Sequence, residues 1–369
     1  MIPADLRCLL VVAVLLALMG CGSDAGPPEQ VEKPDPLGQL ARQNSEEPAG
    51  EFMPPDLTEE EVIAAIIKLG GTVERDEVEG LTVDCSGTKI TDASLVHLKK
   101  LTGLTQLKLG VSRVTDIGLP HIGALTELTH LNLDNASTVS DDGLEHIKGL
   151  TKLEYLHVGN TNVSDGGLVH ISSLTNLNQL VLHNTHVTDA GLVHLTGLAE
   201  LTHLNIYGTK VADAGLAHLK GLTELTHLNL NGTKVTDAGL VHLKGLTKMK
   251  TLFLADTNVT DAGLVHLKGL NHLTYLHLYN EPVSRNTTRI TDSGLVHLTG
   301  LPNLIGLELC NTKITDAGLV HLKRMAQLRF LGVSETKVTH QGAKDLQAAL
   351  PQCKVFPRYR KNWWEDLDL

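Results

Sequence analysis

The residues most suggestive of chemistry are an aspartate and a histidine that recur together, five residues apart, along most of the chain. The aspartate falls at Asp92, Asp116, Asp141, Asp165, Asp189, Asp213, Asp237, Asp261, Asp292 and Asp316, and His340 holds the same place one period later. The histidine follows at His97, His121, His146, His170, His194, His218, His242, His266, His297 and His321. Imidazole groups repeated in this way suggest a metal ladder or a pH sensor.

The spacing of these residues favours a structural explanation for both ladders. Their common period is 24 residues, with one extra residue before Asp141 and seven before Asp292. The stretch Val235–Leu246 reads VTDAGLVHLKGL and is repeated letter for letter at Val259–Leu270. Repetition of this length is typical of a solenoid, in which each coil covers the apolar face of the next. We therefore expect the repeated histidine to be a solvated position on the outer side of the array.

The composition argues against several classes of function. A net charge of -11, with Asp+Glu 42 against Lys+Arg 31, does not fit a nucleic-acid groove. The sequence contains no Walker loop, G-x-S-x-G or H-E-x-x-H motif, so it indicates neither an enzyme nor a cofactor. Cys85, Cys310 and Cys353 lack C-x-x-C spacing, which predicts separate thiols and neither a disulfide framework nor a metal site.

Residues 1–20 are predicted to be a secretory signal peptide. Arg7 precedes an apolar run at Cys8–Met19, which is too short for a stable membrane span. The stretch Leu18–Cys21 resembles a bacterial lipobox. This resemblance implies cleavage before Cys21 and lipidation of its thiol; a plain secreted or uncleaved form is the alternative.

Residues 21–56 are predicted to be a lipidated cysteine followed by a disordered tether. The segment is rich in proline, among Glu, Gln, Gly and Ser, and therefore lacks the apolar residues of a folded core. Gly22 follows the cysteine where an aspartate would suggest retention in the inner membrane. The expected location is thus the bacterial cell envelope, anchored by lipid, with the outer membrane favoured.

Residues 57–84 are expected to form an N-terminal cap. Thr58 and Glu61 form a capping-box signature, an apolar stripe follows at helical spacing, and Gly70-Gly71 ends the helix. Without such a unit the leucines of the first coil would be exposed to water. Two strands are expected to join this helix to the array, at residues 72–75 and 81–85.

Residues 85–355 are predicted to form the coils. The three-residue spacing of Leu240 and Leu243 places both on one face of a short helix. The two-residue spacing of Leu252 and Leu254 places both on one face of a strand. Each coil should therefore contain one short helix and one short strand. The threonine or the aspartate of the TDAGL stretch is expected to cap each helix, where the carboxylate also meets the positive end of the helix dipole.

The pattern L-x-x-L-x-L-x-x-T, as in Leu225–Thr233, resembles the leucine-rich repeat, followed by the TDAGL-type helix of a bacterial subclass. The resemblance covers roughly residues 78–355. It implies an α/β fold: a right-handed, curved solenoid with a concave parallel β-sheet and short convex helices. Where the family often has Asn or Cys, this chain has threonines such as Thr233, whose hydroxyl is expected to donate to a nearby backbone carbonyl.

The strand positions that vary between coils form the predicted binding surface. They lie before, between and after the two core leucines, and the alternation of strand residues turns at least the second and third toward the concave face. Tyr and His gather there, which is typical of binding surfaces; the alternative is that strands attract aromatic residues by propensity alone. The predicted ligand-binding residues are Tyr155, His157, His183, His203, Tyr207, His227, Phe253, Tyr275, His277 and Tyr279.

Three further features qualify this prediction. His203 and His227 occupy equivalent places in adjacent coils, but without a carboxylate they make a poor zinc site, so no metal is predicted. The insertion at residues 281–287, with Arg285 and Arg289, is a candidate for partner contact. The tail at residues 356–369, which holds both tryptophans, is expected to cover the last coil or, alternatively, to dock a partner.

These observations together predict a non-catalytic, lipid-anchored scaffold of the cell envelope. Its concave face is expected to bind a protein or, as a second choice, a glycan, with no nucleic acid and with the membrane reached only through the lipid anchor. The alternative is a structural spacer without a specific ligand, and a metal-binding or enzymatic array is a remote third.

Overall fold

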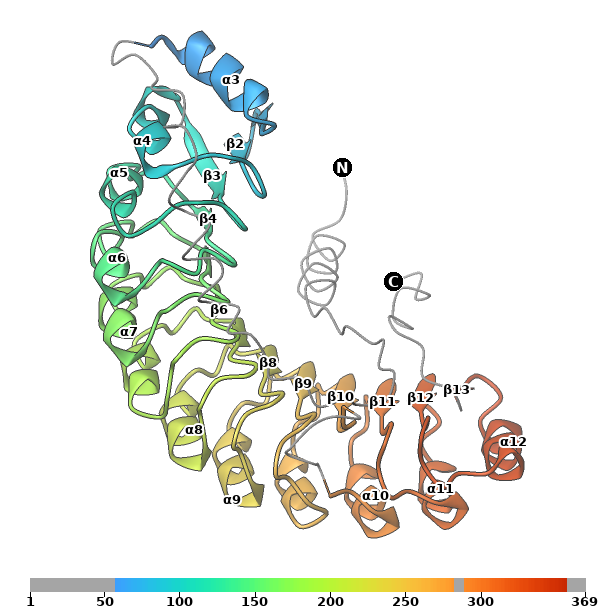
Figure 1. The fold of residues 1–369 in the computed structure, drawn as a ribbon. Coiled ribbons are helices and arrows are strands. Elements are labelled where there is room, and N and C mark those ends of the chain that lie inside the picture. The colour runs from blue at the N-terminus through green and yellow to red at the C-terminus, as the bar shows by residue number, and fades with distance from the viewer. Residues whose placement is uncertain (1–56, 282–288, 357–369) are drawn as a thin grey trace, which may run out of the picture. The chain divides into compact units, whose positions relative to one another are not determined.

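The computed structural model describes residues 57–281 and 289–356. The predicted signal peptide, lipidated Cys21, the tether, most of the insertion and nearly all of the tail lie outside these residues. The described residues form a 13-stranded sheet in which the strands follow one another in chain order. Figure 1 shows this sheet lining the inner side of an arc, with the helices on the outer side. The predicted α/β solenoid is thus confirmed, while the boundaries assigned to its five segments stay predictions.

The coils alternate short strands with short helices, as the leucine spacing predicts. The strands are β1 (Thr72–Asp76), β2 (Gly80–Asp84), β3 (Leu104–Lys108), β4 (His130–Asn132), β5 (Tyr155–His157), β6 (Gln179–Val181), β7 (His203–Asn205), β8 (His227–Asn229), β9 (Thr251–Phe253), β10 (Tyr275–His277), β11 (Gly306–Glu308), β12 (Phe330–Gly332) and β13 (Lys354–Phe356). The α-helices are α3 (Glu59–Lys68), α4 (Asp92–Leu95), α5 (Leu119–Gly123), α6 (Asp141–Glu145), α7 (Asp165–Ile171), α8 (Asp213–Leu219), α9 (Asp237–Leu240), α10 (Asp292–Leu298), α11 (Asp316–Leu322) and α12 (His340–Ala349). The 3-10 helices are η1 (Leu98–Lys100), η2 (Gly191–Leu195), η3 (Val241–Leu243) and η4 (Gly263–Leu267).

The N-terminal cap consists of α3 and the hairpin β1–β2. The Thr58 hydroxyl accepts from the Glu61 backbone N–H at 3.3 Å, and the Glu61 carboxylate accepts from the Thr58 backbone N–H at 2.8 Å, so the predicted capping box is present. Val62 and Ile66 of α3 are buried. Strand β1 is antiparallel to β2, whereas β2 pairs with β3 in parallel, as every later neighbour pair does. The hairpin therefore covers the first edge of the parallel sheet.

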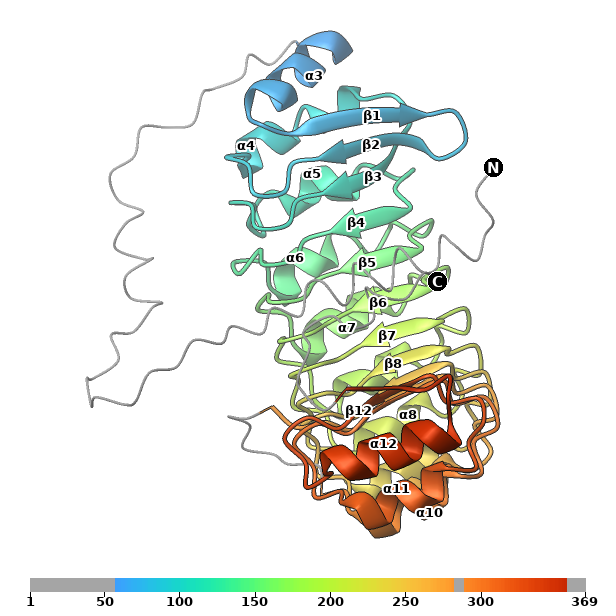
Figure 2. The same ribbon diagram turned by 90° about the vertical axis from the view of Figure 1, so that its right-hand side faces the viewer.

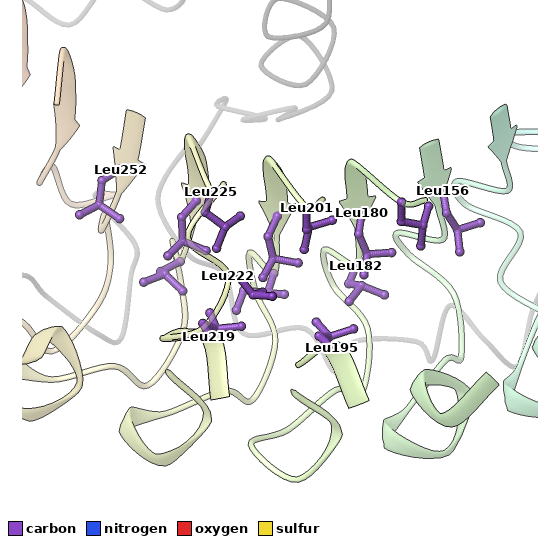
Figure 3. Packing of buried hydrophobic residues seen from close by; sticks show 14 of the residues in the cluster. Leu156, Leu180, Leu182, Leu195, Leu201, Leu219, Leu222, Leu225 and Leu252 are labelled. Carbon is purple, nitrogen blue, oxygen red and sulfur yellow. The ribbon is translucent and has the colours of Figure 1, made fainter. Parts of the chain in front are cut away.

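The core is a single leucine-rich layer between the sheet and the helices. Leu240, Leu243, Leu252 and Leu254 all have 0% exposure, as their spacing predicts. Figure 3 shows leucines of successive coils stacked behind their strands, with Leu195 and Leu219 on the helix side. Each fully buried leucine contributes about 2 kcal/mol by removal of apolar area from water.

The two identical stretches do not form identical helices. Val235–Leu246 forms α9 followed by η3, whereas Val259–Leu270 forms only the 3-10 helix η4. Helices of one turn have little stability of their own, so packing against neighbouring coils decides their form. Both copies nevertheless bury the same leucines, so the core does not depend on the type of helix.

Each threonine of the L-x-x-L-x-L-x-x-T pattern closes the turn after its own strand. The Thr233 hydroxyl donates to the Leu230 backbone carbonyl at 2.6 Å, and the Thr257 hydroxyl donates to the Leu254 carbonyl at 2.7 Å. The same bond recurs for Thr161, Thr185, Thr209, Thr312 and Thr336. The predicted hydroxyl bond is confirmed, and it lies within one coil.

The three cysteines of the array lie apart from one another as free thiols, as the sequence predicts. Cys85, Cys310 and Cys353 are buried free thiols, as separate cysteines in a leucine core should be. Within the described part of the chain, no helix has both the length and the apolar character that a membrane crossing requires.

Candidate functional site

The predicted binding residues come together on the inner face of the sheet. Tyr155, His157 and Gly159 alternate with the core residues Leu156 and Val158, so all three turn away from the core. Parallel pairing in register then places each such position beside its counterpart in the next coil, for example His203 beside His227. Figure 2 shows the strands as successive rungs across this face. The alternation predicted for the second and third positions therefore holds for the first as well.

The prediction of an exposed aromatic face is wrong in one respect, because many of these side chains bury one another. His157 has 0% exposure and His203 5%. The spacing of about 4.8 Å between parallel strands brings rings of adjacent coils into contact, stacked for His203 and His227 and tilted for His157 and His183, which hides part of each ring from water. The residues of the predicted set that are buried are His157, His183, His203, Phe253 and His277; those that are half-buried are Tyr155, Tyr207, His227, Tyr275 and Tyr279.

Ring stacking gives this face a fixed surface. The His203 and His227 rings lie 4.1 Å apart, centroid to centroid, with 7° between their planes. Phe253 and His277 lie 4.3 Å apart at 19°. Each ring is held by its neighbour in the next coil, so the inner face keeps its shape without a ligand.

Hydrogen bonds set the tautomers of the stacked histidines. The Thr202 hydroxyl donates to the Asn178 backbone carbonyl at 2.9 Å and lies 2.8 Å from His203 Nδ1. Because the hydroxyl has one proton and donates it to the carbonyl, we assign the proton of this contact to His203 Nδ1. Thr226 and His227 repeat the arrangement. Nε2 is therefore the unprotonated nitrogen of both stacked rings, and that of His203 is buried.

Burial keeps these histidines neutral near pH 7. It lowers the pKa of His203 to about 4 and, assisted by the His203 and Lys250 charges, the pKa of His227 to about 3. Burial alone lowers the pKa of His277 to about 3. The imidazoles of His203, His227 and His277 are thus uncharged near pH 7, with no charge repulsion between the stacked His203 and His227 rings.

A cluster that the sequence pattern did not single out lies at one end of this face. His157 Nε2 is 3.5 Å from Asp134 Oδ1, and His183 Nε2 is 3.6 Å from the same oxygen. All three residues are buried. Burial lowers the pKa of His157 to about 4 and also lowers that of His183, in each case against the opposing effect of the Asp134 charge. The sequence feature that could have indicated this cluster is that the three residues occupy neighbouring strand positions in three successive coils.

The repeated aspartate proves to be a clamp between coils. Asp213 Oδ1 accepts from the Thr236 backbone N–H at 2.7 Å, and Asp213 Oδ2 accepts from the Thr236 hydroxyl at 2.6 Å. The same hydroxyl caps the helix of its own coil, as predicted, by accepting from Ala238 N at 3.3 Å. The clamp persists across the insertion, where Asp261 holds Thr291. Repulsion between stacked carboxylates is therefore offset by N–H and O–H donors as well as by helix dipoles.

The repeated histidine takes no part in this clamp. Nine of the ten ladder histidines are half-buried or exposed on the outer helices, as predicted for a solvated position. His97 is the exception at 5% exposure, in the coil whose η1 contacts the cap helix α3. Neither repeated residue type therefore forms a reactive centre among the described residues.

The structure describes only the residues at the two ends of the insertion. The Glu281 backbone N–H donates to Asp256 Oδ1 at 2.8 Å, and Arg289 pairs with Thr260 in an isolated parallel bridge. Arg285 lies outside the described residues, so the predicted partner contact stays a prediction.

Comparison with known proteins agrees with this architecture. A family model described as a leucine-rich repeat region matches residues 91–341. An internalin of Listeria monocytogenes is similar in structure, with a TM-score of 0.53 and 20% identity over 82% of this chain and 90% of that one. Internalin C2 of the same organism has a TM-score of 0.44 and 25% identity over 58% of this chain and 82% of that one. At these identities the likeness concerns the fold. No curated protein sequence matches the chain.

Proposed function

The chain belongs to the leucine-rich repeat proteins, and from this premise we propose that it is a non-catalytic scaffold that binds a protein partner on the inner face of its sheet. The observation that carries the proposal is a set of three stacked ring pairs on the inner face, His130 with Tyr155, His203 with His227, and Phe253 with His277.

Two physical properties of this face support binding. Stacking already holds the rings in place, so a partner would not have to immobilise them, and the entropy cost of association is reduced. The half-buried Tyr155, Tyr207 and Tyr275 combine an apolar ring with a polar hydroxyl, the kind of side chain that is enriched at interface hot spots. A glycan could use the same ring faces and hydroxyls, but the width of the face over seven strands favours a protein.

The proposal is tested by partner capture with matched variants. The first variant carries alanine at Tyr155, Tyr207, His227 and Tyr275 on the inner face. The control carries alanine at His194, His218, His242 and His266, which are half-buried on the outer helices. Each protein is incubated with solubilised cell-envelope proteins, and the captured proteins are identified and then titrated individually against each variant.

We expect at least one captured protein to bind the wild type and the outer-face control equally and to lose about 100-fold or more in affinity for the inner-face variant, since hot-spot residues each contribute about 2 kcal/mol or more. Equal binding of every captured protein by all three forms would contradict the proposal and favour a structural spacer. Circular dichroism checks that both variants keep the wild-type fold.

We further propose that the scaffold is tethered to the cell envelope by lipid on Cys21. The support is the Leu18–Cys21 stretch and the proline-rich segment at residues 21–56. Processing of the full chain should be blocked by globomycin, and mass spectrometry of the mature protein should find a lipid-modified N-terminal cysteine. An unmodified N-terminus elsewhere, or processing insensitive to globomycin, would contradict the anchor. The Cys21→Ser variant should leave the membrane fraction.

A further inference from the structure

We propose that Asp134, His157 and His183 bind one divalent transition-metal ion, best matched by Zn²⁺, on the inner face between β4 and β6. The three side chains come from three successive coils and each offers one ligand atom, and these atoms all lie within 4.8 Å of one another. Two imidazoles and one carboxylate form a recurrent protein ligand set for this class of ion, with a fourth position left for water or for a partner's side chain.

The separations between donor atoms fit such an ion. Bonds of about 2.0–2.2 Å in a tetrahedron place neighbouring donors about 3.3 Å apart. His157 Nε2 and His183 Nε2 lie 3.5 Å and 3.6 Å from Asp134 Oδ1. These two separations exceed the tetrahedral value by a few tenths of an ångström, and the separation between the two histidine ligand atoms is within 4.8 Å. The rings are tilted by 47° to each other, so their lone pairs can converge on one point.

The cluster also contains a buried ring nitrogen that makes no hydrogen bond to the described residues. His157 Nε2 is fully buried and has no hydrogen-bond partner in the described part of the chain. Its other ring nitrogen lies 3.4 Å from the Tyr155 hydroxyl. A buried imidazole nitrogen without a partner is costly in a native protein, and a metal ion would satisfy it.

Polar neighbours already orient the proposed ligands. Asn135 Nδ2 donates to Asp134 Oδ2 at 2.7 Å, which leaves Oδ1 facing the two histidines. Asn160 Nδ2 lies 3.1 Å from Asp134 Oδ1 and 2.8 Å from His183 Nε2. The positive end of one amide dipole thus bridges two of the three proposed donors, which marks the place where positive charge is stabilised. Rotation of the Asn160 side chain would admit the ion.

A glycine makes room for the two rings. Gly159 occupies the strand position between Asp134 and His183 in the succession of coils, and a methyl group there would lie 2.9 Å from His157 Nε2 and collide with the His183 ring. Other coils carry Tyr207 or Asn231 at this place. The approach of His157 and His183 therefore depends on this one small residue.

The neighbouring pair His203 and His227 provides an internal contrast. Those rings are parallel within 7° and 4.1 Å apart, so their lone pairs lie in nearly parallel planes and do not meet at one point. The polar side chains two residues further along the same strands are the amides Asn205 and Asn229, which lack the charge of a carboxylate ligand. His203→Gln is therefore a matched control, since it removes a buried histidine of the same face without touching the proposed ligands.

The test is metal binding by the purified full chain after removal of metal with a chelator. Titration with Zn²⁺ against a chromophoric competitor should give one tight site per chain in the wild type and in His203→Gln. His157→Gln and Asp134→Asn should abolish this site. Asn135→Ala should weaken it about 10–100-fold, the usual effect of losing a group that orients a ligand. Absence of a tight site in the wild type, or equal affinity in His157→Gln and Asp134→Asn, would overturn the proposal.

Two further measurements separate this site from the outer histidines and from folding defects. A variant with glutamine at His194, His218, His242 and His266 should keep the site; its loss there would assign the metal to the outer ladder and overturn the proposal. If the ligand variants do not fold, Co²⁺ bound to the wild type decides. An intense tetrahedral spectrum without thiolate charge transfer is expected, and a weak octahedral spectrum or a thiolate band would overturn the assignment.

Discussion

The outer and inner sides of the coils use the same residue types in opposite ways. On the outer side, each of these aspartates accepts hydrogen bonds from a threonine that precedes the helix of the next coil, Asp165 from Thr188 and Asp237 from Thr260. On the inner side, Asp134 meets two histidines, His157 and His183, in a cluster that recurs in no other coil of the described residues. The repeated carboxylates build the solenoid, whereas the unrepeated one offers a binding site.

In a repeat protein, a residue that is the same in every coil therefore indicates a contact that every coil must make. A clamp between coils is needed at each junction, and one junction looks like the next. A ligand touches the array once, so the residues that meet it have no reason to recur.

The largest loss of stability is expected when the glycine two residues after the repeated aspartate is replaced by alanine. A methyl group at Gly239 would collide with the Asp213 carboxylate of the preceding coil, which is already fixed by Thr236. Gly239→Ala should lower the free energy of unfolding by about 2–3 kcal/mol. At Gly245 a methyl group would contact only the Lys220 carbonyl, at 3.9 Å. Gly245→Ala should therefore change the free energy of unfolding by less than about 0.5 kcal/mol.

Urea unfolding of both glycine variants gives the comparison. Equal stability of Gly239→Ala and Gly245→Ala would show that the clamp tolerates a side chain at its base, and the structural explanation of the TDAGL glycine would then be wrong.

A smaller effect is expected when the clamp itself is removed. Asp237→Ala deletes the bonds from the Thr260 N–H and hydroxyl, and should cost about 2 kcal/mol. Asp189 has only the Ala212 N–H as its partner in the next coil. Asp189→Ala should therefore cost about 1 kcal/mol, because one bond fewer is lost. A reversed order of the two in thermal or urea unfolding would contradict the clamp.

An effect of similar size to the loss of one clamp bond concerns the inner face and pH. Burial lowers the pKa of His277 to about 3, so the unfolded chain takes up this proton first as pH falls. The stability contributed by the neutral ring is complete above the unfolded pKa of about 6.5 and is lost progressively toward about 3. Between pH 7 and pH 5 the loss for this group is about 1–2 kcal/mol.

His277→Phe keeps a ring against Phe253 and removes the titration. Its unfolding free energy should fall less between pH 7 and pH 5 than that of the wild type. An identical fall in the two proteins would mean that His277 does not contribute to acid sensitivity.

Much of the fold could be predicted from short-range pattern. The spacing of Leu240 and Leu243 and that of Leu252 and Leu254 correctly assigned the helix, the strand and the buried side of each. The Thr58–Glu61 capping box was also predicted correctly from the sequence. These features depend on residues within a few positions of one another, where helical and strand geometry is known in advance.

For the candidate site, the sequence predicted which face of the sheet carries it but not which side chains meet there. Alternation along the strand correctly turned Tyr155 and His157 toward the concave side, but it could not tell that His157 would be fully buried. That burial depends on the ring orientations of residues contributed by adjacent coils. The same limit explains why Asp134 was absent from the predicted site although both of its histidine neighbours were included.

The sequence by itself determined the period, the core and the direction in which each strand position points, because these follow from local spacing. Tertiary structure alone decided which groups meet across coils. Asp213 and Thr236 are 23 residues apart, and Asp134 and His183 are 49 apart, yet each pair is brought together by stacking of the coils. Partners at such separations depend on side-chain orientation within the stack, which no local pattern encodes.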